Sequence, residues 1–228
     1  MAAKDSVRSP AVEDYAKAIF SLQSRGAETV STNALAERLE ITPGSVSAML
    51  KKLDELGLIT HLPYRGVRLT AAGRRVALEV IRHHRLLERF LADSLGMPWD
   101  RVHDEAEILE HVLSEDVEQL IASKLGNPTV DPHGDPIPGA DLELDEPSTR
   151  SLESLPAGAL GILVRVSDSD PEMLRYLAEQ GIALGDRLRV ADRQPFDGPV
   201  FVRVGEREYP IGGRLARAMR IELEEGEP

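Results

Sequence analysis

The chain has 228 residues, of which 42% are hydrophobic, enough for one large domain or two small domains with buried cores. It contains no cysteine, which excludes a disulfide framework, a zinc-thiolate site and a cysteine nucleophile. No window approaches the roughly 18 consecutive apolar residues of a membrane span, and the N-terminal sequence MAAKDSVRSP lacks the apolar run of a signal peptide. We therefore expect a soluble cytoplasmic protein with no membrane association.

The net charge of −12 is distributed unevenly along the chain. Residues 1–75 contain 11 Lys and Arg and 8 Asp and Glu, a net charge of +3. The remaining residues contain 16 basic and 31 acidic side chains, a net charge of −15. This asymmetry indicates different roles for the two parts and makes the first part a candidate for contact with nucleic acid.

The first 75 residues have the pattern of a winged helix. Apolar residues at helical spacing predict helices over residues 12–24, 31–40 and 43–56. The third helix begins with Thr42 as N-cap and Pro43 at its first position, and Gly57 follows its end. The short interval before it is typical of a helix-turn-helix, and the alternating residues that flank YRG predict a hairpin, the wing.

A winged helix places the N-terminal part of its third helix in the major groove. The residues there are small and mostly hydroxylated, which predicts few base contacts, while Lys and Arg side chains would contact phosphate. The predicted DNA-binding residues are Thr42, Pro43, Ser45, Ser47, Lys51, Lys52 and Arg65. Winged helices also serve as protein-contact modules, but the local excess of positive charge favours DNA.

The rest of the sequence divides into helical, polar and β-rich parts. Capping residues and helical spacing predict helices over residues 70–96, 99–113 and 114–126. Residues 127–158 are dense in Pro, Gly, Asp and Ser and read as a linker. From Ala159 the apolar period changes to two, which predicts a small β-barrel of short strands with one helix inserted after the first strand.

Residues 103–111, HDEAEILEH, place two histidines and four carboxylates in one predicted helix. At about 100° per residue, Glu107, Glu110 and His111 fall near 40°, −20° and 80° from His103, within about a third of the circumference. An apolar stripe lies beside this polar face, so the face borders a packed interface. Uncompensated carboxylates are costly there, and a divalent cation would offset the cost.

Two other predicted helices carry similar donors. His84 and Glu88 stand four residues apart on one face of the long helix, and Asp14 interrupts the apolar pattern of the first helix. A solvated acidic face would explain one such helix, whereas three helices with Asp, Glu and His favour a metal site. Oxygen and imidazole donors without sulfur suit Mn²⁺ or Fe²⁺ better than Cu⁺ or structural zinc, and excluding Zn²⁺ would depend on geometry.

The chain resembles the diphtheria toxin repressor family of metal-dependent transcription repressors, of the manganese-responsive (manganese transport regulator) type. The resemblance is carried by EDYAKAIFSL, the winged helix, HHRLLERFL, VHDEAEILEHVLS, PHGDPIPG and the small C-terminal barrel. It implies a mainly α protein with a small β domain. The implied parts are a winged-helix DNA-binding domain over residues 1–75, a helical metal-binding and dimerisation domain over 76–128, a linker over 129–158 and an SH3-like (FeoA-like) β-barrel over 159–228.

The resemblance also implies two metal sites. The primary site would be formed by Asp14, Glu107, Glu110 and His111, and the second by His84, Glu88, His103 and Asp170. Iron-responsive relatives have Met and Cys in place of Asp14 and Glu107, so the two carboxylates indicate a manganese-responsive protein. Lys17 stands where some manganese-responsive members have a carboxylate that completes a closely spaced binuclear site, and we therefore expect two separated sites.

The function that the resemblance implies is a homodimeric repressor that binds palindromic operator DNA when loaded with Mn²⁺ and controls metal-uptake genes. Metal would tie the first helix to the dimerisation helices and fix the separation of the recognition helices, which must match half-sites about one helical turn apart. The alternatives are activation by Fe²⁺ or Zn²⁺, or a di-metal carboxylate enzyme. The enzyme is disfavoured because neither a Glu-x-x-His pair nor His-Glu-x-x-His occurs.

Overall fold

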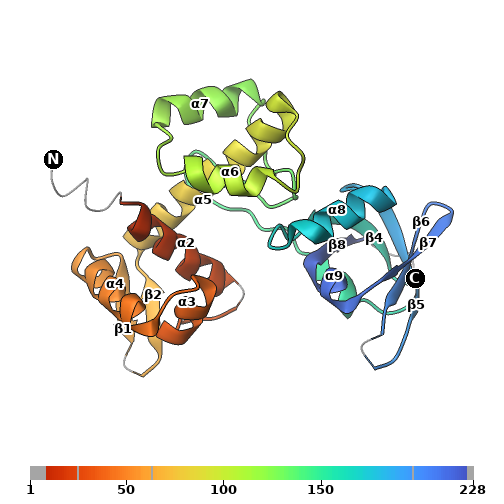
Figure 1. The fold of residues 1–228 in the computed structure, drawn as a ribbon, viewed down its shortest axis with the longest axis horizontal. Coiled ribbons are helices and arrows are strands. Elements are labelled where there is room, and N and C mark those ends of the chain that lie inside the picture. Colours follow the sequence, from red (N-terminus) through yellow and green to blue (C-terminus); the bar gives the residue numbers. More distant parts are fainter. Residues whose placement is uncertain (1–8, 25, 63, 197, 225–228) are drawn as a thin grey trace. The chain divides into compact units, whose positions relative to one another are not determined.

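A computed structural model describes residues 9–224, apart from positions 25, 63 and 197 (Figure 1). The described residues form two compact units. The first contains the described residues up to His84 together with Glu107–Leu120 and Pro138–Leu144. The second contains Arg85–Ala106, Ile121–Ile137 and the described residues from Asp145 onward. Each unit therefore combines segments that are far apart in the sequence.

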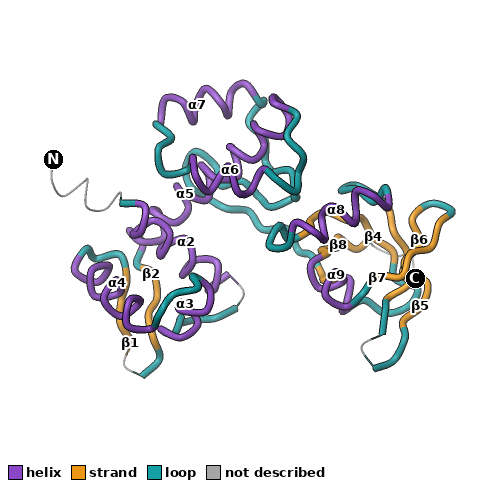
Figure 2. Tube along the Cα trace, viewed as in Figure 1, coloured by secondary structure: helices purple, strands orange, loops and turns teal. Residues whose placement is uncertain are grey.

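The N-terminal part of the first unit is a winged helix. Its elements are α2 (Pro10–Ser24), α3 (Thr32–Arg38), α4 (Pro43–Glu55), β1 (Ile59–Leu62) and β2 (Gly66–Leu69). Ser31 and Thr42 cap α3 and α4 by accepting hydrogen bonds from the backbone amides of Ala34 and Ser45. β1 and β2 pair as an antiparallel hairpin, shown as two orange strands in Figure 2. The predicted winged helix-turn-helix is confirmed.

Helix α2 buries two different faces. Val12, Tyr15 and Ile19 join the core beneath α3 and α4. Ala16 and Phe20 pack in a second cluster against residues of α5 (Ala71–Leu95) that belong to the first unit, namely Ala77, Leu78 and Ile81. A polar strip between the two faces carries Glu13, Asp14 and Lys17. α2 therefore joins the core of the winged helix to the cluster on α5.

The helices that follow α5 are shorter than predicted. α6 spans Val102–Leu109 and α7 spans Glu115–Lys124, so Glu110 and His111 lie in the turn between them. The amide of Val112 donates to the carbonyl of Leu109 in this turn, and the hydroxyl of Ser114 accepts from the amide of Val117 in the first turn of α7. The helical wheel drawn through residue 111 is therefore wrong at its C-terminal end, because the chain has to turn before the next N-cap.

Residues 127–149 contain an isolated bridge between Val130 and Pro136 but no helix. The segment is nonetheless partly buried. Asp131 and His133 are 2% and 0% exposed in the second unit, and Leu142 and Leu144 pack on the Ala16–Phe20 cluster of the first. The part around Asp131 and His133 therefore belongs to the second unit, and the part around Leu142 and Leu144 belongs to the first.

The C-terminal part of the second unit is a small antiparallel β domain. Its elements are β3 (Arg150–Ser151), the 3-10 helix η1 (Leu152–Ser154), β4 (Leu160–Val166), α8 (Pro171–Gln180), β5 (Arg187–Arg193), β6 (Val200–Val204), β7 (Arg207–Ile211), α9 (Gly213–Ala218) and β8 (Met219–Leu223). The strand order is β3-β8-β4-β5-β6-β7. Leu163, Leu177, Val190, Val202 and Ile221 are among the buried core residues.

The predicted strands at β4 to β7 and the helix at α8 are confirmed, whereas α9 and β8 are not part of the prediction. β8 pairs with both β3 and β4 inside the sheet. Its residues follow α9 in GRLARAMRIEL with no Gly, Pro or Asn between the helix and the strand. Among the described residues, no helix is both long and apolar enough to cross a membrane.

Candidate metal centre

Asp14, Glu110 and His111 converge in the first unit. The Nε2 atom of His111 lies 3.0 Å from Asp14 Oδ1 and 3.6 Å from Glu110 Oε1. The Glu110 side chain is fully buried, that of His111 is 12% exposed and that of Asp14 is 41% exposed. One ligand atom from each residue lies within 4.8 Å of the others. The site is therefore open on the α2 side and closed on the side of the α6–α7 turn.

The electrostatics of this cluster favour a cation. Burial raises the pKa of the Asp14 carboxyl above its usual value. His111 opposes the rise, while the negative charges of Glu110 and Glu107 add to it. A carboxylate that is harder to ionise beside two others gains from a positive charge placed among them.

Two residues outside the predicted set orient these donors. Glu13 Oε2 lies 2.6 Å from His111 Nδ1, so Nδ1–H donates to Glu13, and Nε2 is the ring nitrogen that faces Asp14 and Glu110. His83 Nδ1 lies 3.1 Å from the carbonyl oxygen of Glu110. The sequence carries one signal for Glu13, its place beside Asp14 in the polar strip of α2.

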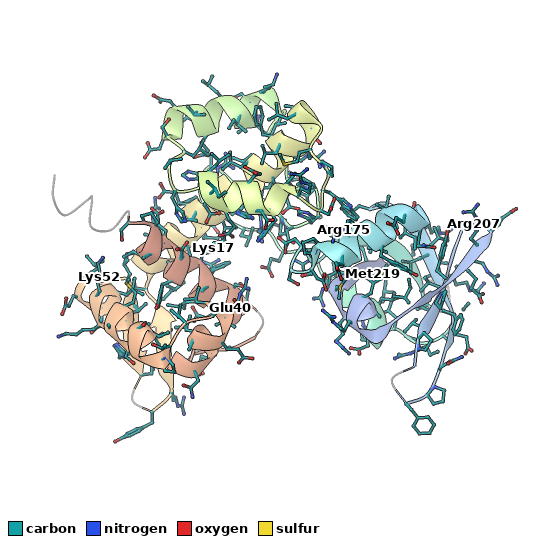
Figure 3. The ribbon with its side chains drawn as sticks, in the orientation of Figure 1. Lys17, Glu40, Lys52, Arg175, Arg207 and Met219 are labelled. Atoms are coloured by element: carbon teal, nitrogen blue, oxygen red, sulfur yellow. The ribbon has the colours of Figure 1, made fainter. Side chains whose placement is uncertain are left out.

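Glu107 is joined to Glu110 by a lysine, and His84 contacts Glu110 directly. Lys17 Nζ on α2 (Figure 3) donates to Glu107 Oε1 at 2.6 Å and to Glu110 Oε2 at 2.8 Å. His84 Nδ1 is 2.5 Å from Glu110 Oε2. His84 and Glu107 thus lie in the first unit together with Glu110.

A separate cluster forms in the second unit around His103. Its Nδ1 atom is 3.3 Å from Glu88 Oε1 and 3.0 Å from Asp168 Oδ2. The hydrogen bonds to Asp168 and Glu88 raise the pKa of His103 to about 10. Burial raises the pKa of Asp168, but the hydrogen bond and charge of His103 outweigh it, so the net shift is downward. The three side chains form an ion-paired cluster, and their oxygen and imidazole atoms are donors of the kind that a divalent cation takes.

Asp170 lies elsewhere. It is the N-cap of α8, where Oδ1 accepts from the amide of Glu172 and Oδ2 accepts from Arg214 at 2.9 Å. The carboxylate beside His103 is Asp168, two residues earlier, which the sequence analysis does not name. Met173 packs against the core of the β domain. Asp is common both as a helix N-cap and as a metal ligand, so the sequence alone does not distinguish the two roles, whereas the fold does.

Asp131 and His133 extend the second cluster inward. His133 Nε2 lies 2.7 Å from the carbonyl oxygen of Trp99, and its Nδ1 lies 3.7 Å from Glu88 Oε2 and 4.0 Å from Asp131 Oδ1. Nδ1 is buried and makes no hydrogen bond within the described part of the chain. Burial lowers the pKa of His133, but the nearby carboxylates have the larger, opposite effect, so the pKa is raised to about 9.

The backbone explains why His133 is held so firmly. Its carbonyl oxygen accepts from the amide of Val166 in β4 at 2.9 Å. Gly134 has a φ of +86°, and a Cβ at that position would lie 1.9 Å from the carbonyl oxygen of Val164. Only glycine permits this approach. The PHGD sequence therefore docks on the sheet and directs His133 toward Glu88.

The predicted DNA-facing residues are accessible to solvent. Thr42, Pro43, Ser45, Ser47, Lys51 and Arg65 are exposed, and Lys52 is partly exposed on α4 (Figure 3). The Lys51 side chain is 81% exposed and lies 3.9 Å from Glu55. The Thr42 side chain caps α4, so part of its role is structural.

A winged helix joined to a cluster of converging oxygen and imidazole donors defines a DNA-binding protein with a candidate metal centre. Family profiles match in the same order. They are described as iron dependent repressor, N-terminal DNA binding domain (residues 9–67), iron dependent repressor, metal binding and dimerisation domain (70–139), and FeoA domain (150–223).

Individual proteins agree with the profiles. The iron-dependent repressor IdeR of Mycobacterium bovis is 34% identical over 223 residues, covering 92% of this chain and 96% of that protein. The diphtheria toxin repressor of Corynebacterium diphtheriae is 30% identical over 220 residues, with coverage of 92% and 96%.

Solved structures agree as well. One described as a manganese-dependent transcriptional repressor in complex with manganese has a TM-score of 0.87 and 44% identity, covering 93% of this chain and 99% of that one. The manganese regulator SloR has a TM-score of 0.77 and 31% identity, covering 93% and 98%. The chain belongs to the diphtheria toxin repressor family of metal-dependent transcriptional repressors. It is a regulator and not an enzyme, with a DNA-binding, a dimerisation and an SH3-like domain.

Proposed function

We propose that this chain is activated by Mn²⁺ and represses metal-uptake genes in the cytoplasm by binding palindromic operator DNA as a homodimer. The observation that carries the proposal is the sulfur-free donor set formed by Asp14, Glu110 and His111. Hard and borderline donors of this kind suit Mn²⁺ and Fe²⁺. One similar solved structure is described as a manganese-dependent repressor and another as a manganese regulator, whereas the relative IdeR is described as iron-dependent, so Fe²⁺ is the alternative signal.

The primary site in this proposal consists of Asp14, Glu107, Glu110 and His111. A bound divalent cation supplies the positive charge that offsets the repulsion among the three carboxylates. Glu13 holds His111 in the tautomer that presents Nε2 to the site. Glu107 contributes one oxygen to Lys17, and a carboxylate has a second oxygen that can serve as a ligand.

The second site in this proposal consists of Glu88, His103 and Asp168, with Asp131 and His133 adjoining Glu88. We propose Asp168 in place of Asp170 because it lies 3.0 Å from His103 while Asp170 caps α8. The buried His133 Nδ1, which faces two carboxylates, has the arrangement of a metal ligand whose other nitrogen is fixed by a backbone carbonyl. His84 stays a prediction for this site.

The coupling to DNA follows from α2. Its apolar faces belong to the core of the winged helix and to the cluster with α5, while its polar strip carries Asp14. Ligation of Asp14 together with Glu110 and His111 fixes α2 against the α6–α7 turn. The winged helix moves with α2, so metal favours one placement of the recognition helix. The size of the effect is set by the difference in metal affinity between the two placements.

The DNA contacts in this proposal are Thr42, Pro43, Ser45, Ser47, Lys51, Lys52 and Arg65. Lys51, Lys52 and Arg65 would contact phosphates, which contribute affinity without sequence preference. The small residues at the start of α4 would approach base edges.

An exposed apolar face on the helical part fits dimerisation. Ile108, Val112, Val117 and Leu120 are 68%, 77%, 45% and 68% exposed. All four belong to the first unit, close in sequence to the donors of the primary site. A second copy that covers this face would place two recognition helices on one duplex, as a palindrome requires.

Operator-binding anisotropy tests the proposal. A fluorescent duplex carrying a family-type palindrome is titrated with protein and Mn²⁺, anaerobic Fe²⁺, Zn²⁺ or a chelator. We expect the tightest binding with Mn²⁺ and only weak, non-specific binding with the chelator. Binding that is strongest with Fe²⁺ or Zn²⁺ would overturn the choice of metal, and equal binding with the chelator would overturn metal activation. The Asp14→Ala variant, measured alongside, should bind as wild type does in the chelator.

A further inference from the structure

Two sets of metal-capable side chains in the first unit share Glu110. One consists of Asp14, Glu110 and His111, and the other of His84, Glu107 and Glu110. In each set, one ligand atom per residue lies within 4.8 Å of the others. Two adjacent donor sets joined by a shared carboxylate have the arrangement of a site for a pair of cations.

The second set surrounds an ammonium group. Lys17 Nζ lies 2.6 Å from Glu107 Oε1, 2.8 Å and 3.0 Å from the two oxygens of Glu110, and 3.3 Å from His84 Nδ1. It therefore contacts every member of the set. An ammonium has three protons to donate and no acceptor, so it can serve both carboxylates at once, while His84 Nδ1–H donates to Glu110 Oε2 at 2.5 Å.

These contacts are partly shielded from water, so they contribute more to stability than exposed ion pairs do. The side chain of Glu110 is fully buried and that of Lys17 is 21% exposed. Leaving a buried carboxylate without its partner is strongly destabilising, whereas a fully exposed pair contributes little. The ammonium also stands between Glu107 and Glu110, whose negative charges would otherwise repel each other.

We propose that Lys17 is a built-in cation that occupies the second of two adjacent cation positions, so that the primary site takes a single metal ion and Lys17 determines this stoichiometry. The inference deepens the proposed function, since it rests on the primary site assigned there. In the metal-free protein, Lys17 keeps Glu107 and Glu110 together. Only the position bounded by Asp14, Glu110 and His111 is left for a divalent ion.

The proposal predicts what happens when the charge of residue 17 is reversed. Lys17→Glu removes the ammonium and places a fourth carboxylate beside Asp14, Glu107 and Glu110. The oxygen and imidazole donors of the second set then suit a second Mn²⁺. Lys124→Glu on α7 makes the same charge change at an exposed position and serves as the control.

Equilibrium dialysis with metal analysis, together with electron paramagnetic resonance of bound Mn²⁺, tests this. Lys17→Glu should bind about one more Mn²⁺ per chain than wild type, with the broadened signal of a spin-coupled pair. Lys124→Glu should match wild type in both. A coupled pair in wild type, or no additional ion in Lys17→Glu, would overturn the proposal. Asp14→Ala in the wild-type background separates the two claims, because an unchanged Mn²⁺ count there contradicts the primary site itself.

A second variant tests the proposal even if Lys17→Glu does not fold. Lys17→Met keeps the length of the side chain but removes its charge, leaving Glu107 and Glu110 unneutralised. Its thermal midpoint in chelator should fall below that of wild type, and excess Mn²⁺ should raise it by more than it raises wild type. A midpoint in chelator equal to or above that of wild type would show that the ammonium does not serve as a cation for these carboxylates.

Discussion

At the scale of single residues, the candidate metal-binding histidines are oriented by hydrogen bonds to neighbouring groups. His111 is a ligand candidate because its Nδ1–H donates a hydrogen bond to Glu13 and its Nε2 faces Asp14. His133 is fixed in the same way by the carbonyl of Trp99. Tautomer control of this kind is a general property of metal-binding histidines, and neither partner is apparent from the ligand pattern alone.

Glu13→Ala should weaken the primary site without removing a ligand. Without the carboxylate, His111 is no longer restrained to present Nε2, and loss of such a partner typically lowers metal affinity about 10- to 100-fold. Calorimetric titration with Mn²⁺ measures the change. Glu37→Ala, at an exposed position on α3, is the control. Equal affinities for Glu13→Ala and Glu37→Ala would show that Glu13 has no orienting role.

The ion pair of His103 should make metal-free stability depend on pH. Asp168 and Glu88 raise the pKa of His103 from 6.5 to about 10, so its stabilising contribution is complete below pH 6.5 and disappears as the pH rises through about 10. His103→Gln, measured in chelator, should therefore lower the thermal midpoint more at about pH 6 than at about pH 10. An equal effect at both values would mean that His103 is uncharged in the folded state.

At the scale of elements, the sequence predicts what is periodic and misses what depends on tertiary contact. Capped amphipathic helices such as α3 and α4 follow from local signals. The end of α6 does not, because the same residues could continue a helix if Ser114 did not begin another. The burial of Asp131 and His133 in a Pro- and Gly-rich segment also depends on contact, through Gly134 and β4.

The choice between Asp168 and Asp170 shows the same limit in the site. Both are short carboxylates near the start of α8, and the one immediately before Pro171 has the stronger helix-cap signal. The ligand candidate is the one in the preceding loop. The primary-site donors were easier to predict, since Glu107, Glu110 and His111 are close in sequence and stay close after α6 ends.

Paired substitutions distinguish the two aspartates. Asp168→Ala should abolish or strongly weaken the metal-binding event of the second site while the primary event remains. Asp170→Ala should instead leave both binding events and lower stability by about 1 kcal/mol, the usual effect of losing an N-cap. Calorimetry with Mn²⁺ and denaturant unfolding give the two readouts. The reverse pattern would return Asp170 to the ligand set.

At the scale of the whole molecule, the basic residues and the exposed apolar residues are concentrated in different parts of the sequence. The excess of basic residues lies in the first 75 positions, although the chain as a whole has a net charge of −12. The exposed apolar side chains Ile108, Val112, Val117 and Leu120 lie close in sequence to the primary-site donors. In the proposed function, metal sensing, DNA contact and self-association therefore all depend on residues of the first unit.

A charge placed on the apolar face should separate metal binding from repression. Leu120 on α7 is 68% exposed, so Leu120→Glu leaves the core intact but puts a carboxylate where two copies would meet. Gln119→Glu adds the same charge to the neighbouring position and is the control. We expect Leu120→Glu to sediment as a monomer and to lose at least about tenfold in Mn²⁺-dependent operator affinity, equivalent to about 1.4 kcal/mol.

Its Mn²⁺ affinity at the primary site should be retained, because Leu120 does not belong to that site. A dimer of unchanged affinity would place the dimer contact on another surface, and a monomer that still binds the full palindrome like wild type would show that dimerisation is not required for operator recognition.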